Sequence, residues 1–382
     1  MTNRLALPVL LVSGGLVFSP LALADIELGE GLALYGNVRG GYFNLRREDR
    51  DGSKDTREDW RVRVRAGLQW QPAERWTLAA RFAGRYSTNQ DDHSFALDWH
   101  ATSPTGLALG EATLDEAYAA YQGDGWSLKV GRFQVSHELD GVAKKGLDRN
   151  DSPNTDITWT DGVQWQMDLA AGWQATVVAD YNDREGPSNA RHKPLDFSAS
   201  NARLSGFAAL ENAEPWGVVV QRSFSVTYLP DALYPRGLDG SSGDYSALAA
   251  RTALQWPLGD NGSAFLLGLE AGHAFDTPRQ ATMGLPGSGD SDGLAWQVSF
   301  NLMNLVPGHS IGLVGSRADA GWLLSPDFIP NSEMVEVRYQ WRVDKHQSFE
   351  ARLRYREDLD KLLSVASERQ DTDFYLRYTY KF

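Results

Sequence analysis

Apolar and polar side chains alternate with a period of two over many segments of this chain. Between residues 60 and 70, Trp60, Val64 and Leu68 fall on one parity and Arg61, Arg63 and Arg65 on the other. A strand places alternate residues on opposite faces, whereas a helix would mix them. The same alternation recurs at residues 76–82, 163–169, 294–302, 335–343, 349–355 and 374–382. The chain is therefore expected to be all-β.

Counting these runs predicts about sixteen strands of roughly ten residues, the length that crosses a bilayer when tilted. The connections between them alternate in length, which is typical of a transmembrane antiparallel β-barrel with short periplasmic turns and long extracellular loops. The short connections are expected at residues 71–74, 123–125, 170–172, 306–308 and 344–347. The long ones are expected at residues 46–59, 91–113, 136–158, 184–200, 230–244, 276–292, 320–332 and 359–371.

A secreted β-sandwich is the alternative, because period two alone does not separate it from a barrel. Aromatic residues at both ends of apolar faces, such as Trp60 and Trp70, favour a barrel with interfacial girdles. The even, high strand count and the final Phe382 point the same way. A mean hydropathy of −0.41 and the lack of any later run of 18 apolar residues argue against membrane-spanning helices.

The N-terminus has the organisation of a secretory signal peptide. Arg4 precedes an apolar run, and Ala22-Leu23-Ala24 forms a typical cleavage site, so we expect residues 1–24 to be removed and residues 25–382 to form one barrel. The chain has no cysteine, which excludes disulfides and thiolate sites. The formal charge is −13, and loss of Arg4 leaves 36 basic and 50 acidic residues, or −14, which argues against nucleic acid as a partner.

Two segments resemble known families. Residues 371–382 resemble the C-terminal strand of Gram-negative porins, whose final phenylalanine, here Phe382, is read by the barrel-assembly machinery. Residues 114–121 with 128–133 resemble a hairpin of the phosphate-selective porins O and P, and alginate-export barrels carry similar hairpins. The resemblance implies an outer-membrane channel for small water-soluble solutes, possible homotrimers and no cofactor, and it assigns no particular solute.

Basic residues on the polar parity are expected to face the lumen. An arginine facing lipid at mid-bilayer costs about 2–4 kcal/mol, so an inward basic arc would form and favour small anionic or neutral solutes. The alternative is that these groups pair with inward carboxylates such as Glu336 and Glu350. The predicted pore-lining residues are Arg39, Arg61, Arg63, Arg65, Arg81, Arg85, Arg338, Arg342, Arg352, Arg354, Arg356, Arg377 and Lys381.

The third long connection follows the fifth predicted strand. In porins of similar size the loop at this place folds inward, so the resemblance implies a constriction; a solvated surface loop is the alternative. The predicted constriction residues are Glu138, Asp140, Lys144, Lys145, Asp148 and Arg149.

Other functions have weaker support in the sequence. Residues 148–156 have the oxygen spacing of a calcium loop, but Pro153 and Trp159 occupy positions that need Gly and Glu, so no metal is expected. The seven histidines are scattered and no nucleophile motif is present, which disfavours an outer-membrane enzyme. An export barrel for an acidic polysaccharide stays open, since an arginine-rich lumen would also pass such a polymer.

Overall fold

A computed structural model describes residues 26–90, 96–98, 106–151, 154–182, 203–233, 243–259, 262–325 and 327–382. The predicted signal peptide, residues 1–24, lies outside these ranges. Within them, no helix is long and apolar enough to cross a membrane.

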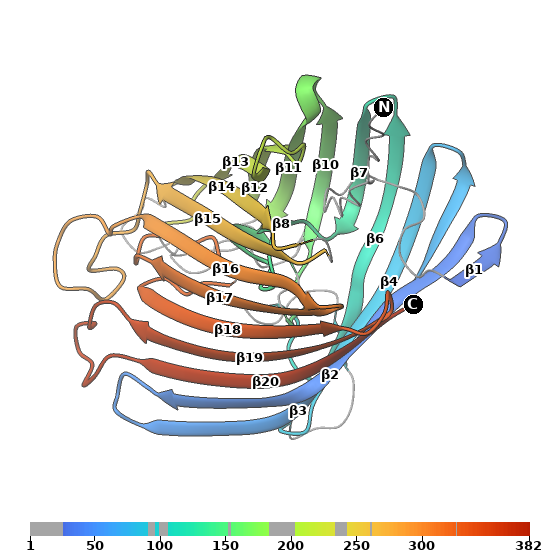
Figure 1. The fold of residues 1–382 in the computed structure, drawn as a ribbon. Coiled ribbons are helices and arrows are strands. Elements are labelled where there is room, and N and C mark those ends of the chain that lie inside the picture. Colours follow the sequence, from blue (N-terminus) through green and yellow to red (C-terminus); the bar gives the residue numbers. More distant parts are fainter. Residues whose placement is uncertain are drawn as a thin grey trace, which may run out of the picture.

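Sixteen long antiparallel strands of the described chain close into one barrel (Figure 1), which confirms the predicted fold class and strand number. Each strand pairs with the next barrel strand along the chain, because tight turns or single loops join them. The strands are β2 (Leu32–Glu48), β3 (Lys54–Ala73), β4 (Trp76–Ser87), β6 (Glu111–Gly123), β7 (Trp126–Phe133), β10 (Thr160–Asp168), β11 (Trp173–Asn182), β12 (Arg203–Asn212), β13 (Val219–Leu229), β14 (Tyr245–Pro257), β15 (Ala264–Ala274), β16 (Leu294–Val306), β17 (His309–Ala318), β18 (Ser332–Arg342), β19 (Gln347–Asp358) and β20 (Gln370–Lys381).

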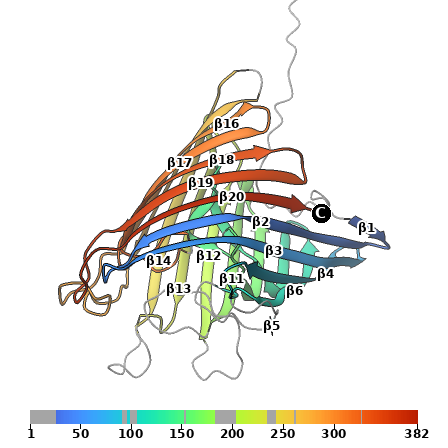
Figure 2. The same cartoon turned by 90° about the horizontal axis from the view of Figure 1, so that it is seen from below.

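The first and last barrel strands close the ring. β2 pairs with β20 from Asn37 opposite Lys381 to Glu48 opposite Gln370. Figure 2 shows β16 to β20 and β2 to β4 running side by side along one wall. The short strand β1 (Ile26–Gly29) pairs with the start of β2, and β5 (Ala96–Leu97) with β6. A single 3-10 turn, η1 (Ala170–Gly172), joins β10 to β11.

The two ends of the barrel differ. One end, here the short-turn end, carries brief connections such as residues 124–125 and 307–308, and the other, the long-loop end, carries the longer ones. The first hairpin departs from the expected loop at residues 46–59, because β2 and β3 continue as strands to a turn at residues 49–53. Ion pairs stabilise this extension: Arg47 contacts Asp371 at 2.9 Å and Arg50 contacts Asp358 at 2.6 Å.

The outer face of the barrel is apolar. Val64 and Leu68 on β3 are about half exposed, while Arg63 and Arg65, on the other parity of the same strand, are buried inside. Exposed aromatic side chains gather toward both ends, as expected for interfacial girdles. They include Trp70, Trp76, Trp126, Trp256 and Trp341 at the short-turn end and Trp60, Tyr228, Trp296 and Tyr355 at the long-loop end.

Described parts of the third long connection and of the connection from β17 to β18 fold into the barrel. The third long one contains a small hairpin, β8 (Ser136–Leu139) and β9 (Lys145–Asn150), which packs against β14, β15 and β16 and is called the interior hairpin here. In the connection from β17 to β18, the described residues 319–325 and 327–331 are called the interior loop. It was expected at residues 320–332 as a polar external loop, but Trp322, Leu323 and Leu324 are almost fully buried. Its apolar side chains are removed from water only by entering the lumen.

Candidate functional site

A cavity of about 1060 Å³ lies inside the barrel. Lumen-facing residues of β2, β3, β18, β19 and β20, called the basic wall here, form one side of it. The interior hairpin and Asp327 of the interior loop form another side, and the short-turn ends of β13 to β16 line it below, with residues such as Gln255 and Leu266.

Positive groups outnumber negative ones around this cavity. Of the described lining residues, eleven are lysines or arginines and six are carboxylates, an excess of five positive charges. The cationic residues are Arg39, Arg61, Lys144, Lys145, Arg338, Arg342, Arg352, Arg354, Arg356, Arg377 and Lys381, and the acidic ones are Glu138, Asp140, Asp156, Asp327, Glu350 and Asp373.

Strand register gathers some of the positive groups in one row. Arg342 lies opposite Ser348, Ser348 opposite Thr379, and Thr379 opposite Arg39. Lys381 follows on the same face of β20, within electrostatic range of Arg39, Arg342 and Lys144. Within the described part of the chain, the side chains of Arg342, Arg356, Lys144 and Lys381 have no carboxylate or hydrogen-bond partner. Their charge is thus not compensated by a close contact.

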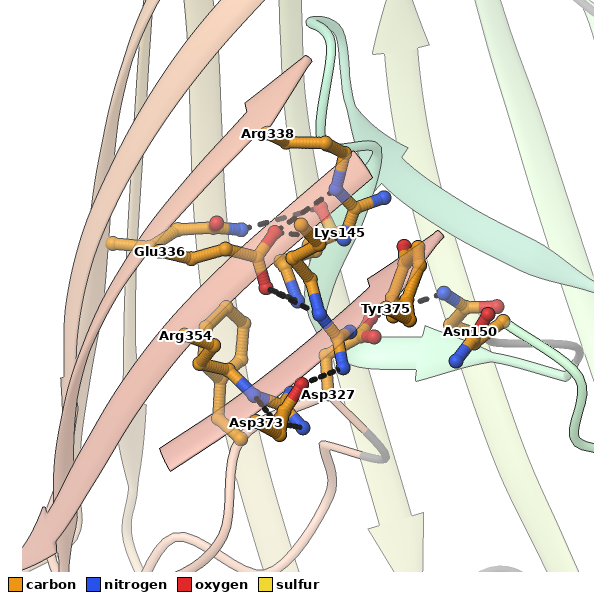
Figure 3. Close-up of polar contacts among 12 residues, drawn as sticks. Lys145, Asn150, Asp327, Glu336, Arg338, Arg354, Asp373 and Tyr375 are labelled. Atoms are coloured by element: carbon orange, nitrogen blue, oxygen red, sulfur yellow. Dashed lines mark hydrogen bonds and ion pairs between the residues drawn. The ribbon is translucent and has the colours of Figure 1, made fainter. Parts of the chain in front are cut away.

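Other cations of the basic wall are paired (Figure 3). Glu336 contacts Arg338 at 2.7 Å and Lys145 of the interior hairpin at 3.1 Å. Asp373 contacts Arg354 at 2.5 Å and also Arg352. A second carboxylate, Glu350, contacts Arg377 at 2.9 Å and Arg338 at 3.3 Å. The structure therefore combines both readings of the sequence: part of the basic arc is paired and part is not.

Four predicted lining residues do not reach the cavity. Arg65 and Arg81 share Asp115, at 2.7 Å and 2.9 Å. Arg63 donates to the carbonyl of Asp156 at 3.1 Å, and Arg85 pairs with its carboxylate at 2.7 Å.

Residues 154–156, called the strap here, lie across the inner face of the wall and are held there by arginine side chains. Besides Arg63 and Arg85, it receives Arg39 at the carbonyl of Asn154 and Arg377 at the Asn154 side-chain oxygen, 2.6 Å away. Four arginines from β2, β3, β4 and β20 thus hold one strap. The sequence gives no sign of this role, because carbonyl acceptors carry no residue-type signature.

Buried charges anchor the interior hairpin to the opposite wall. Asp148 pairs with Arg251 at 2.8 Å, and Arg251 pairs with Glu270 at 3.0 Å. Burial acts to raise the pKa of Asp148, but the charge of Arg251 outweighs it and holds this pKa below its usual range. Arg149 pairs with Asp180 at 2.6 Å. Of the predicted constriction residues, Glu138, Asp140, Lys144 and Lys145 face the cavity, whereas Asp148 and Arg149 are buried anchors.

The calcium-like spacing at residues 148–156 is used otherwise. Asp148 binds Arg251, and the Asn150 side chain donates to Asp327 at 3.0 Å; residues 152–153 lie outside the described ranges. Over the described ranges, no three His, Asp or Glu side chains gather as a metal would require.

Known structures share this architecture. OprB of Pseudomonas putida aligns with a TM-score of 0.59 and 12% identity, over 92% of this chain and 94% of that one. An anion-selective porin from Comamonas acidovorans gives 0.53 and 10% over 92% and 99%. OccK8 (OprE) of Pseudomonas aeruginosa gives 0.52 and 12% over 91% and 98%.

The chain has the fold of a Gram-negative outer-membrane porin. At 10–12% identity the likeness is one of architecture. No protein-family model and no curated protein sequence matches the chain. Within this porin fold, the interior hairpin follows the fifth barrel strand, β7, which is the position that the strand count predicted for the third long connection.

Proposed function

We propose that this protein is an outer-membrane porin for passive diffusion of small water-soluble solutes, with a preference for anions. The observation that carries the proposal is a closed barrel, apolar outside, around a polar cavity with five excess positive charges. A bilayer accepts a closed barrel because every strand is paired and no sheet edge meets lipid. A channel function, not an enzymatic one, suits a cavity inside a closed barrel that is lined by charged groups.

The anion preference is compatible with the acidic sequence, because permeation responds to the field inside the lumen. Charges on exposed loops are screened within about 8 Å at physiological salt. Charges beside a narrow cavity with low-dielectric walls are focused. The Comamonas acidovorans porin of similar fold is itself described as anion-selective.

The proposal includes export by the N-terminal signal, insertion by the barrel-assembly machinery through the strand that ends at Phe382, and association as homotrimers. Cell fractionation with N-terminal sequencing tests export and cleavage after Ala24. Cross-linking in mild detergent tests the trimer, and recovery of monomer alone would contradict that part.

Ion selectivity is the direct test of the channel. The purified protein is inserted in planar bilayers, and the reversal potential is measured in a KCl gradient. We expect discrete conductance steps and a reversal potential closer to the equilibrium potential of chloride than to that of potassium. The double variant with Arg342→Gln and Lys381→Gln should move the reversal potential toward potassium. Among the described residues neither cation has a carboxylate partner, so the double variant leaves no carboxylate newly unpaired.

A matched control variant removes the same number of positive charges, two, at exposed positions outside the cavity lining. Arg57→Gln with Arg75→Gln removes two arginines whose ion-pair partners, Asp55 and Asp124, are exposed. This control should leave the reversal potential in place. A closed bilayer would refute the channel, and a potassium-selective wild type would refute the anion preference.

A further inference from the structure

The part of the lumen along β13 to β18 is filled by packed side chains. An apolar cluster joins Leu147 of the interior hairpin and Trp322, Leu323 and Phe328 of the interior loop to lumen-facing residues of β13 through β18. The wall members of this cluster are Leu229, Tyr245, Ala247, Ala249, Ala274, Ala295, Val314, Ala318 and Met334. The cluster is dry, because its members are at most 7% exposed.

The barrel wall is shaped for the inserted segments. A Cβ at Gly272 on β15 would lie 2.3 Å from the Trp322 ring, so only glycine leaves room for this side chain. Gly268 lies four residues earlier on the same face of β15, and a Cβ there would lie 2.5 Å from Leu139 of the interior hairpin. Small residues at these positions and at Ala247, Ala249 and Ala295 make the wall complementary to bulky segments from elsewhere in the chain.

Directional bonds fix the interior loop in place. The Tyr245 hydroxyl donates to the carbonyl of Gly321 at 3.2 Å and accepts from the backbone N–H of Leu323 at 3.1 Å. The Trp322 indole N–H donates to the carbonyl of Leu147 at 2.9 Å. Ser325 donates to the carbonyl of Gly146 at 3.0 Å. The interior loop and the interior hairpin are thus bonded to each other as well as to the wall.

This packing adjoins the basic wall at β18 and extends from there along β17 to β13. The cavity follows β18, β19, β20, β2 and β3, and reaches the far side only near the short-turn ends of β13 to β16. Arg338, Arg352 and Arg377 therefore line the cavity, whereas Ala247, Ala249 and Ala274 face packed side chains.

We propose that the interior loop is a built-in plug that determines the solute specificity of the pore. With the interior hairpin it closes the part of the lumen along β13 to β17, which is lined by alanine, serine and glycine, and so forces every solute along the basic wall. This inference rests on the proposed channel function. Removing the plug would open a wider path past uncharged residues, so conductance would rise and charge selectivity would fall together.

The natural absence of cysteine allows a test that needs no channel activity. Ala249→Cys places a thiol beneath the plug, and Ser348→Cys places one on the cavity wall. A charged, water-soluble thiol reagent is applied to the protein in detergent. We expect Ala249→Cys to react at least about tenfold more slowly than Ser348→Cys, since its labelling requires local opening of packed structure.

Replacing residues 320–328 by a glycine–serine segment of equal length should make Ala249→Cys react as fast as Ser348→Cys. The same replacement in the cysteine-free protein should raise single-channel conductance severalfold and bring the reversal potential toward zero. Heat-dependent mobility on gels verifies that the barrel is folded. If it is not, Trp322→Ala serves instead, with the outward-facing Trp296→Ala as the matched control, and should accelerate labelling while the control does not.

The outcomes separate the two proposals. Fast labelling of Ala249→Cys in the intact protein, or unchanged conductance after loop replacement in a folded barrel, would overturn the plug. A silent wild type in bilayers with protected Ala249→Cys would overturn the channel function and leave the packed plug established as a structural seal.

Discussion

Phe382 and Gly36 exchange two backbone hydrogen bonds, with N···O distances of 2.7 Å and 3.1 Å. These bonds continue the ladder between β20 and β2 to the last residue. A side chain at position 36 has no room, because a Cβ there would lie 2.2 Å from the carbonyl oxygen of Arg65 and 2.9 Å from the Phe382 ring. The closing seam of the barrel therefore depends on a glycine and on the terminal aromatic residue.

Gly36→Ala should weaken closure of the barrel. Overpacking at such a site costs about 1–3 kcal/mol, which should lower the denaturant midpoint and the folded fraction seen by heat-dependent mobility. Gly315→Ala is the matched control, because a Cβ at Gly315 meets no atom within 4 Å. Equal stability of the two variants would show that the seam tolerates a methyl group.

Arg251→Gln should release the interior hairpin. The change leaves Asp148 and Glu270, both buried, without their common cation, and loss of one partner of a buried pair costs about 3–5 kcal/mol. Chemical unfolding and protease cleavage between residues 136 and 150 report the effect. Arg57→Gln, which breaks an exposed pair with Asp55, should cost at most about 1 kcal/mol. Comparable losses in both variants would contradict the anchoring role.

Arginines of the same arc should give different phenotypes according to their contacts. Replacing Arg352, Arg354 and Arg356 with glutamine removes three charges from the cavity and should shift the reversal potential toward potassium. Replacing Arg63 and Arg65 removes no cavity-lining group and takes from the buried Asp115 one of its two arginine partners, so reduced unfolding stability should dominate. A larger selectivity change from the second pair would refute this division.

Acidification should increase the anion preference. Burial and the nearby Asp327 raise the pKa of Glu138 above its ordinary value, although Lys144, Arg39 and Arg338 oppose this shift. As pH falls from 7, Glu138 gains its proton earlier than an ordinary glutamate and the cavity loses a negative charge. Reversal potentials measured at several pH values should move toward chloride.

Glu138→Gln is expected to show that shift already at pH 7 and to remove part of the pH dependence. Glu74→Gln, on an exposed turn, serves as the control and should behave as wild type. Identical pH profiles for wild type and Glu138→Gln would rule out this carboxylate as the titrating group.

The strands of the barrel wall can be predicted well from the sequence, because the period-two alternation of apolar and polar residues marks each strand. The inward parity assigned to Arg63 and Arg65 and the outward parity of Trp60 and Leu68 both agree with their burial. An ion pair such as Arg47 with Asp371, which joins residues more than 300 positions apart, extends β2 beyond the apolar stretch and leaves no local signal.

Loop positions inside the lumen are harder to predict. Trp322-Leu323-Leu324 is an apolar run in a segment bounded by turn residues, and it reads as a loop from its flanks alone. Its destination depends on Gly272, Tyr245 and Leu147, which come from three other elements. The pairing of Arg352 and Arg354 with Asp373 likewise follows from register between two strands, which the sequence does not specify.

The division of the lumen between two walls has a practical meaning for engineered nanopores. β13 to β16 hold most of the wall residues that pack against the inserted segments, and β18 to β20 present most of the lysines and arginines that line the cavity. A designer can therefore recode the facing side chains for a chosen analyte while the framework stays intact. Because the natural chain has no thiol, a single cysteine on β19 or β20 would give one unambiguous attachment point for a recognition group.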